Sequence, residues 1–225
     1  RHLCCVVADG AGGHGGGEVA SRLAVSHIIE RFAATPLNNI DDVRDMLLST
    51  NDSVIEHRSD APELRQMHTT VVSLFIDLHS GEAFWGHAGD SRLYLFRDGQ
   101  LLERTKDHSL VQSLVEAGLL TPEQTRSHPR RSELQSALGT DPSYLRVSTA
   151  ARAWPTRAGD VFLLCTDGLW EYVEESDLAL TLKQADGPVA WLQTLEAKVL
   201  EAVAAAGKTG HDNFSAVAVW ARGSA

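Results

Sequence analysis

The chain has 225 residues and carries 30 acidic side chains against 20 Lys and Arg, which gives a formal charge of −10. A hydrophobic content of 43% with 22% charged residues is ordinary for a globular protein, so a disordered or fibrous chain is excluded. The acidic balance disfavours nucleic acid as the main partner, because that task concentrates Lys and Arg. The excess carboxylates form either a solvated surface or a set gathered for a purpose such as metal binding.

The longest apolar stretches, such as Leu3–Ala8 and Val161–Cys165, are far shorter than the ~20 residues of a membrane-spanning helix. No basic segment followed by an apolar core opens the sequence, so we expect no secretory signal and no membrane partner. The three cysteines, Cys4, Cys5 and Cys165, fit neither a disulfide framework nor a cysteine-rich zinc site. We therefore expect reduced thiols in a cytoplasmic protein.

The first third of the sequence predicts one strand followed by two helices. The strand covers Leu3–Ala8 and runs into the glycine-rich segment Gly10–Gly17. Apolar residues at spacings of three and four predict a helix through Val19–Phe32 and a second helix through Asp41–Val54.

Strands dominate the rest, and Asp98-Gly99 is a strong hairpin signal between two of them. The predicted strands are Thr69–Ile76, Glu82–His87, Arg92–Phe96, Gln100–Arg104, Leu145–Ala151, Asp160–Thr166 and Phe214–Trp220. Because hairpins link them and helices come in pairs, we expect an α+β fold with antiparallel sheets covered by helices, not a βαβ series.

Helical segments are predicted at His108–Ala117, after Pro122, at Glu175–Lys183 and at Pro188–Ala206. The polar segment His128–Pro142 between them resembles a flap. No repeat or linker divides the sequence, so we expect one domain over residues 1–225, with a candidate flap at residues 108–142.

The glycine-rich segment fits the dinucleotide-binding pattern G-x-G-x-x-G, and Glu30 stands where a ribose-binding acid is sought. However, the segment after the helix, Ala33–Asp42, is polar and broken by Pro and Asn, so the second parallel strand is missing. The charge of Asp9 would also oppose a pyrophosphate. A Rossmann site is therefore the weaker interpretation.

Four aspartates stand at predicted strand boundaries: Asp9, Asp90, Asp167 and Asp212. Three are next to glycine, and the fourth is separated from Gly210 by one residue. Asp-Gly alone marks turns, but four carboxylates at one sheet edge would repel each other without a cation between them. Oxygen ligands of this kind favour Mg²⁺, Mn²⁺ or Ca²⁺.

The glycine-rich segment, Asp9 to His14 followed by Gly17-Glu18 and Ala20-Ser21, resembles the D-G-M-G-G-H…G-E-x-A-S segment of bacterial protein phosphatases of the 2C, metal-dependent PPM family. Further motifs keep the order of that family: Thr69-Thr70-Val71, Gly86-His87-Ala88-Gly89-Asp90-Ser91-Arg92, Thr105-Lys106-Asp107-His108-Ser109, Ala137-Leu138-Gly139, Cys165-Thr166-Asp167-Gly168 and Asp212-Asn213-Phe214-Ser215. Matches of this kind run from Val6 to Val219.

The resemblance implies a phosphoserine/phosphothreonine protein phosphatase on an α-β-β-α sandwich of two antiparallel sheets flanked by helices. It implies a Mn²⁺ or Mg²⁺ centre of two ions whose shared water attacks phosphorus. By position, Asp9 would bridge the ions, the Gly10 carbonyl would bind one, and Asp167 with Asp212 would hold the other. Asp90 together with Asp167 would supply a third, weaker site.

Three departures from the family pattern matter. Only eight residues precede Asp9, whereas the family has an earlier strand with a phosphate-binding Arg and an acidic ligand, so we expect a trimmed N-terminus. Animal members have a His where this chain has Ala11, which leaves His14 as a candidate proton donor or a loop residue. His68 stands where the family usually has Gly.

The missing acid and Arg leave one alternative open, a catalytically impaired binding or regulatory module on the same fold. The other histidines near the motifs are interpreted as structural or ligand-orienting residues, and the substrate-binding residues are not identified. The expected partners are phosphorylated proteins, substrates of a cognate Ser/Thr kinase. We expect a monomer that binds neither nucleic acid nor membrane.

Overall fold

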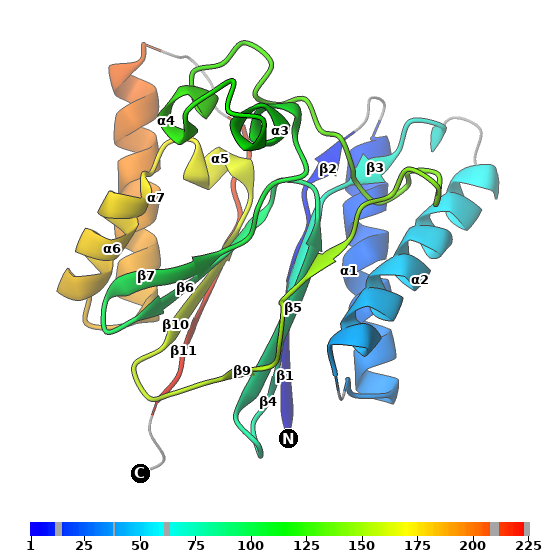
Figure 1. Cartoon of the computed structure of the whole chain (residues 1–225), viewed down its shortest axis with the longest axis horizontal. Helices are drawn as coiled ribbons and strands as arrows, with labels where there is room; N and C mark the ends of the chain where they lie inside the picture. Colours follow the sequence, from blue (N-terminus) through cyan, green and yellow to red (C-terminus); the bar gives the residue numbers. More distant parts are fainter. Residues whose placement is uncertain (12–14, 38, 61–63, 208–211, 223–225) are drawn as a thin grey trace. The chain divides into compact units, whose positions relative to one another are not determined.

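The computed structural model describes residues 1–11, 15–37, 39–60, 64–207 and 212–222 (Figure 1). The chain divides into two compact units. Unit 1 combines Arg1–Ser91 with Lys106–Pro155, and unit 2 combines Arg92–Thr105 with Thr156–Ala225. Unit 2 therefore begins with a short segment inserted between the two parts of unit 1. One domain over the whole chain stays a prediction.

Unit 1 is built on an antiparallel sheet in the order β1-β4-β5-β8, with β9 also paired to β5 and a separate ladder of β2 and β3. These strands are β1 (His2–Val7), β2 (Gly10–Ala11), β3 (His68–Thr69), β4 (Val71–Asp77), β5 (Glu82–Ala88), β8 (Ser148–Thr149) and β9 (Trp154–Pro155). Strand β4 is buried from Val71 to Ile76, which confirms the predicted central strand.

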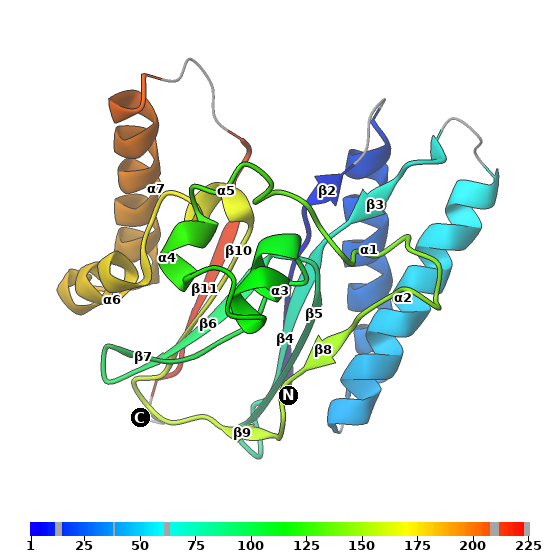
Figure 2. The same ribbon diagram turned by 45° about the horizontal axis from the view of Figure 1, so that its top comes forward.

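Two long helices, α1 (Gly16–Ala34) and α2 (Ile40–Asp60), lie side by side along this sheet (Figure 2). Their apolar faces are the predicted ones, and Ile28 of α1 and Val54 of α2 are fully buried. Helix α2 approaches β5 closely at Gly86, where a Cβ atom would lie 2.8 Å from Cγ1 of Val43. Only glycine fits there.

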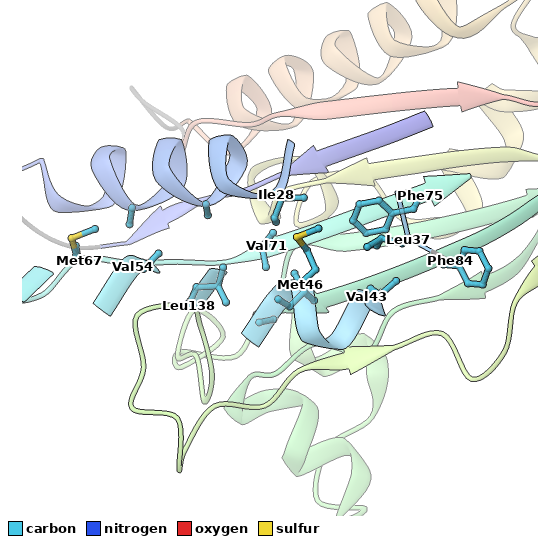
Figure 3. Packing of buried hydrophobic residues seen from close by; sticks show 14 residues of the cluster. Ile28, Leu37, Val43, Met46, Val54, Met67, Val71, Phe75, Phe84 and Leu138 are labelled. Atoms are coloured by element: carbon cyan, nitrogen blue, oxygen red, sulfur yellow. The ribbon is translucent and has the colours of Figure 1, made fainter. Parts of the chain in front are cut away.

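The core of unit 1 continues from the helices into the sheet (Figure 3). Phe75 of β4 and Phe84 of β5 pack in it, together with Met46 of α2. Leu138 joins the same cluster from the segment that follows the short helices α3 (Leu110–Glu116) and α4 (Pro122–Thr125). The base of the candidate flap thus belongs to the core of unit 1.

The described residues of unit 2 form a four-stranded antiparallel sheet in the order β11-β10-β6-β7 and three helices. Its elements are β6 (Arg92–Arg97), β7 (Gln100–Arg104), β10 (Val161–Cys165), α5 (Asp167–Trp170), α6 (Glu175–Gln184), α7 (Pro188–Ala205) and β11 (Ala216–Trp220). Trp191 of α7 is fully buried, and its indole N–H donates to Oγ1 of Thr181, 3.0 Å away. The Asp98-Gly99 hairpin is confirmed, since both residues have positive φ.

Two predicted strands are shorter than expected. The strand predicted at Leu145–Ala151 narrows to β8, because Leu145 ends a turn in which its N–H donates to the carbonyl of Asp141. The strand predicted from Phe214 begins at Ala216, because the N–H of Ser215 donates to the Thr166 hydroxyl instead of a strand carbonyl.

Every strand pair formed by the described residues is antiparallel. This pairing confirms the α+β class. It also rules out, among these strands, the parallel βαβ unit that a Rossmann site requires. Among the described helices, none is both long enough and apolar enough to cross a membrane.

Candidate metal centre

Asp9 follows β1 and is fixed through its backbone. Its carbonyl accepts hydrogen bonds from the N–H of Thr70 (2.8 Å) and from the hydroxyl of Thr69 (2.9 Å). Its own N–H donates to Oγ1 of Thr70, 3.1 Å away. The half-buried Asp9 therefore has little freedom in its main chain.

Gly10 pairs with Thr69 in the β2-β3 ladder and lies against the start of α1. A Cβ atom on Gly10 would stand 1.9 Å from the carbonyl oxygen of Gly17, and one on Gly17 would stand 2.5 Å from that of Gly10. The glycine-rich segment is thus needed for close packing between loop and helix. Its centre, including His14, lies outside the described residues.

Asp90 sits in the turn after β5 and is 6% exposed. Gly89 before it has φ of +104°, and a Cβ there would meet the Thr70 side chain at 2.7 Å. Ser91 after it shares a 2.7 Å hydrogen bond with the Thr70 hydroxyl. We call Asp9, Thr70, Gly89 and Ser91 the Thr70 cluster, because Thr70 brings the two aspartate-bearing turns together.

A buried imidazole supports the same turn. Nδ1 of His108 accepts a 3.3 Å hydrogen bond from the backbone N–H of Gly89. The backbone N–H of His108 donates in turn to the Gly89 carbonyl, 2.9 Å away. Its ring stacks on His87 with centroids 4.6 Å apart. Burial, followed by the charges of His87 and Arg146, lowers the pKa of His108 to about 3. His108 is therefore neutral, and its Nε2 donates to the hydroxyl of Ser148.

In unit 2, Asp167 is the first residue of α5, directly after β10. The N–H of Thr166 donates to the carbonyl of Ser215 (3.1 Å), and Ser215 returns a bond to the Thr166 hydroxyl (3.1 Å). A Cβ on Gly168 would lie 2.4 Å from the carbonyl oxygen of Asn213. The turn of Asp167 and the segment of Asp212 are therefore neighbours.

Asp212 itself is exposed, and one of its carboxylate oxygens accepts the N–H of Asn213 (2.8 Å). Residues 208–211 before it, including His211, lie outside the described part of the chain. Thr70 thus connects the turns of Asp9 and Asp90 in unit 1, and Gly168 packs against Asn213, the residue after Asp212, in unit 2. Within the described residues, no group of three His, Cys, Asp or Glu side chains is gathered for a metal ion.

A buried arginine at the end of the motif Gly86–Arg92 supports α5. Arg92 is 4% exposed, and its guanidinium lies 3.5 Å from the ring centre of Trp170. It also lies 3.3 Å from the carboxylate of Glu175 at the start of α6. The motif and the place of Arg92 at the head of the apolar run Arg92–Phe96 mark this residue in the sequence, but neither identifies its partners.

In each unit the aspartate carboxylates, joined in unit 1 by the Gly10 carbonyl, offer oxygen only, which is the donor type that hard divalent cations prefer. Any Cβ atom at Gly10 or Gly168 would clash with neighbouring backbone, so glycine keeps both aspartate turns tightly folded. The chemistry of the donors in each unit therefore suits Mg²⁺ or Mn²⁺.

A family model described as "Protein phosphatase 2C" matches residues 1–206. The chain belongs to the protein phosphatase 2C family. The family resemblance expected from the motifs is thereby confirmed. Among curated relatives, the Ser/Thr protein phosphatase PstP of Mycobacterium tuberculosis is 37% identical over 179 residues, or 79% of this chain. The match covers 34% of PstP, so the chain corresponds to about a third of that relative.

Solved structures of the same family share the fold. A crystal structure of PstP/Ppp from Mycobacterium tuberculosis has a TM-score of 0.84 and 30% identity, covering 98% of this chain and 88% of that one. A structure of the PstP catalytic domain with 2 manganese ions has a TM-score of 0.76 and 28% identity, covering 96% of this chain and 86% of that one. The fold class expected from the resemblance is confirmed, and dependence on a divalent metal is typical of the family.

Proposed function

We propose that this chain hydrolyses phosphoserine and phosphothreonine esters of proteins with the help of Mn²⁺ or Mg²⁺. One observation carries the proposal. Two pairs of strand-end aspartates, in turns and strand ends held by hydrogen bonds, occur in a chain of the protein phosphatase 2C family. Relatives named as Ser/Thr phosphatases support this activity over a non-catalytic module.

Asp9, Asp90 and the Gly10 carbonyl would bind metal in unit 1, and Asp167 with Asp212 would bind it in unit 2. The two manganese ions named for the PstP catalytic domain support a centre of two ions. When bound, such ions lower the pKa of water and neutralise charge on the phosphoryl oxygens.

The residues of the chain would position and orient these ligands. The Thr69 and Thr70 hydroxyls fix the main chain of Asp9, so that its carboxylate needs little reorganisation. The neutral His108 holds the Gly89 turn at both its N–H and its carbonyl, which fixes the main chain beside Asp90. No nucleophilic side chain is needed, because the attacking group would be water. The identity of the proton donor is left to experiment, with His14 as a candidate.

The decisive experiment measures hydrolysis of p-nitrophenyl phosphate and of a phosphothreonine peptide with and without Mn²⁺. We expect turnover that requires the metal and that falls by roughly 100-fold or more in Asp167→Asn, which removes one charged ligand. Asp186→Asn is the matched control, because Asp186 is exposed just after α6 and belongs to no site described above. Full activity in the presence of a chelator would contradict the proposal, and metal binding without turnover would favour the non-catalytic module.

The physiological partners would be proteins phosphorylated by a Ser/Thr kinase. Cys4, Cys5 and Cys165 are not joined in disulfides, which supports a reducing compartment such as the cytoplasm. Burial raises the pKa of Cys4 to about 12, so this thiol is a poor nucleophile. A monomeric state also belongs to this proposal, and light scattering of the purified chain tests it.

A further inference from the structure

Unit 1 contains a cavity of about 490 Å³ next to the turn of Asp9. We call it the Ala11–His68 pocket. Its walls come from β2, from the residues at β3, and from the segment between α4 and β8. They include Ala11, Gln66, His68, Ser132, Gln135 and Thr140.

The pocket begins one residue away from a proposed metal ligand. Ala11 follows Gly10 and is the direct partner of His68 in the antiparallel β2-β3 ladder. Side chains of directly opposite residues share one face of a ladder, with Cβ atoms about 5 Å apart. A group bound in this pocket would thus lie beside the loop that presents Asp9 and Gly10.

The walls are held in place before any ligand arrives. Leu138 exchanges two backbone hydrogen bonds with Thr69, at 2.8 and 3.1 Å. The N–H of Gly139 donates to the side-chain oxygen of Asn51 (2.8 Å), and its carbonyl accepts from Arg58 (2.7 Å). Figure 3 shows Leu138 among the core side chains of unit 1. A preformed pocket of this kind is typical of a binding site.

The lining mixes polar and apolar side chains and carries almost no charge. Amides, hydroxyls and apolar side chains, Leu134 among them, surround one imidazole, and none of the described lining residues is Asp, Glu, Lys or Arg. Nδ1 of His68 lies 3.0 Å from the carbonyl of Gln66 and so carries the proton, which leaves Nε2 for a ligand. The side-chain oxygen of Gln135 accepts from the Ser113 hydroxyl (2.6 Å), which leaves its NH₂ group as a donor.

We propose that the Ala11–His68 pocket binds the uncharged polar residues beside the phosphorylated Ser or Thr of a substrate protein. His68 and Gln135 are then specificity-determining residues that contact the peptide through Nε2 and the amide NH₂. This inference rests on the proposed function. An extended peptide matches the chemistry, because it offers N–H and C=O groups and needs no countercharge.

The experiment uses phosphothreonine peptides whose neighbouring residues are neutral, acidic or basic, with p-nitrophenyl phosphate as a substrate without neighbours. The wild type should prefer the neutral peptide. Ser132→Arg should raise kcat/KM for the acidic peptide relative to the neutral one by about two- to fivefold, and Ser132→Glu should shift it in the opposite direction. Ser127→Arg and Ser127→Glu are controls, because Ser127 is exposed on the same segment outside the pocket.

His68→Ala should lower the ratio of peptide to aryl phosphate kcat/KM by about three- to tenfold, mainly through KM, since one hydrogen bond is lost. Equal losses for both substrates, or no change in the ratio for any pocket variant, would overturn the inference. If neither the wild type nor any variant hydrolyses the aryl phosphate, the proposed function is contradicted, and the pocket is then tested by peptide binding alone. Fluorescence anisotropy of the labelled neutral peptide then decides: weaker binding to Ser132→Trp than to Ser127→Trp supports the pocket, and equal binding overturns it.

Discussion

In unit 1, the turns that carry Asp9 and Asp90 meet at one hydroxyl group, that of Thr70. In unit 2, Asp167 depends on strand-end hydrogen bonds between Thr166 and Ser215, and Asp212 is exposed. Side-chain hydrogen bonds therefore position the first pair of proposed ligands, and the ends of two strands position the second pair. Because different interactions position the two pairs of aspartates, different perturbations should disrupt them.

The largest effect should come from the buried ion pair that supports the sheet of unit 2. Arg97 donates two 2.7 Å hydrogen bonds to Asp160, which has no exposed surface. Arg97→Ala leaves that carboxylate buried without its charge partner and should lower the free energy of unfolding by about 3–5 kcal/mol. Urea denaturation measures this loss.

Two variants bracket the expected result for the Arg97–Asp160 pair. Arg97→Lys keeps the charge but not the bidentate geometry, so its loss should be smaller. Arg22→Ala removes an exposed partner of Glu18 and should leave stability unchanged within error. If Arg97→Ala leaves the free energy of unfolding unchanged, the packing of β6 and β10 does not depend on this pair.

Acid should act mainly on unit 1, because the described part of unit 2 contains no histidine. An imidazole in an unfolded chain titrates near pH 6.5, whereas the folded pKa of His108 is about 3. Between these values the unfolded chain binds a proton that the folded chain does not. Stability is thus fully present above pH 6.5 and is lost as the pH falls, by about 2 kcal/mol from pH 7 to pH 5.

Burial also lowers the pKa of His87, which adds a loss of the same sign. Urea denaturation at both pH values measures the total, and His108→Asn should reduce the pH dependence. Hydrogen exchange should locate the loss in β4 and β5. An equal loss of protection in β6 and β10 would contradict a local effect.

The smallest effect should follow from deleting the hydroxyl of Thr70. Thr70→Val keeps the shape of the side chain but removes the acceptor for the Asp9 N–H and the partner of Ser91. We expect a loss of about 1–2 kcal/mol in stability, and Mn²⁺ binding weaker by about tenfold in calorimetry. Thr194→Val is the control, since Thr194 is exposed on α7. Unchanged Mn²⁺ affinity would show that Asp9 does not depend on this hydroxyl.

The local elements were predictable because each depends on near neighbours in sequence. Apolar spacing predicts the buried faces of α1 and α2, and Asp98-Gly99 predicts its hairpin because both residues adopt positive φ. The strand-boundary positions of Asp9, Asp90 and Asp167 were predictable for the same reason, since a turn residue follows an apolar run.

The contacts that support those aspartates were not predictable from local patterns. Thr70 interrupts the strand predicted at Thr69–Ile76, and its hydroxyl meets Ser91, 21 residues away. Arg92 meets Glu175, which is 83 residues away. Such contacts are fixed by the assembled sheet, and no periodicity marks them. The Ala11–His68 pocket likewise combines three separate segments.

The insertion of the β6-β7 hairpin into unit 1 has a consequence for biosynthesis. Strand β6 pairs with β10, which is translated only after the remaining segment of unit 1, Lys106–Pro155. At a translation rate of about 5–20 residues per second, the backbone groups along this edge of β6 remain unpaired for several seconds. A ribosome that pauses between these segments would lengthen the time for which this edge of β6 is unpaired, so aggregation during expression should respond to translation speed in this interval.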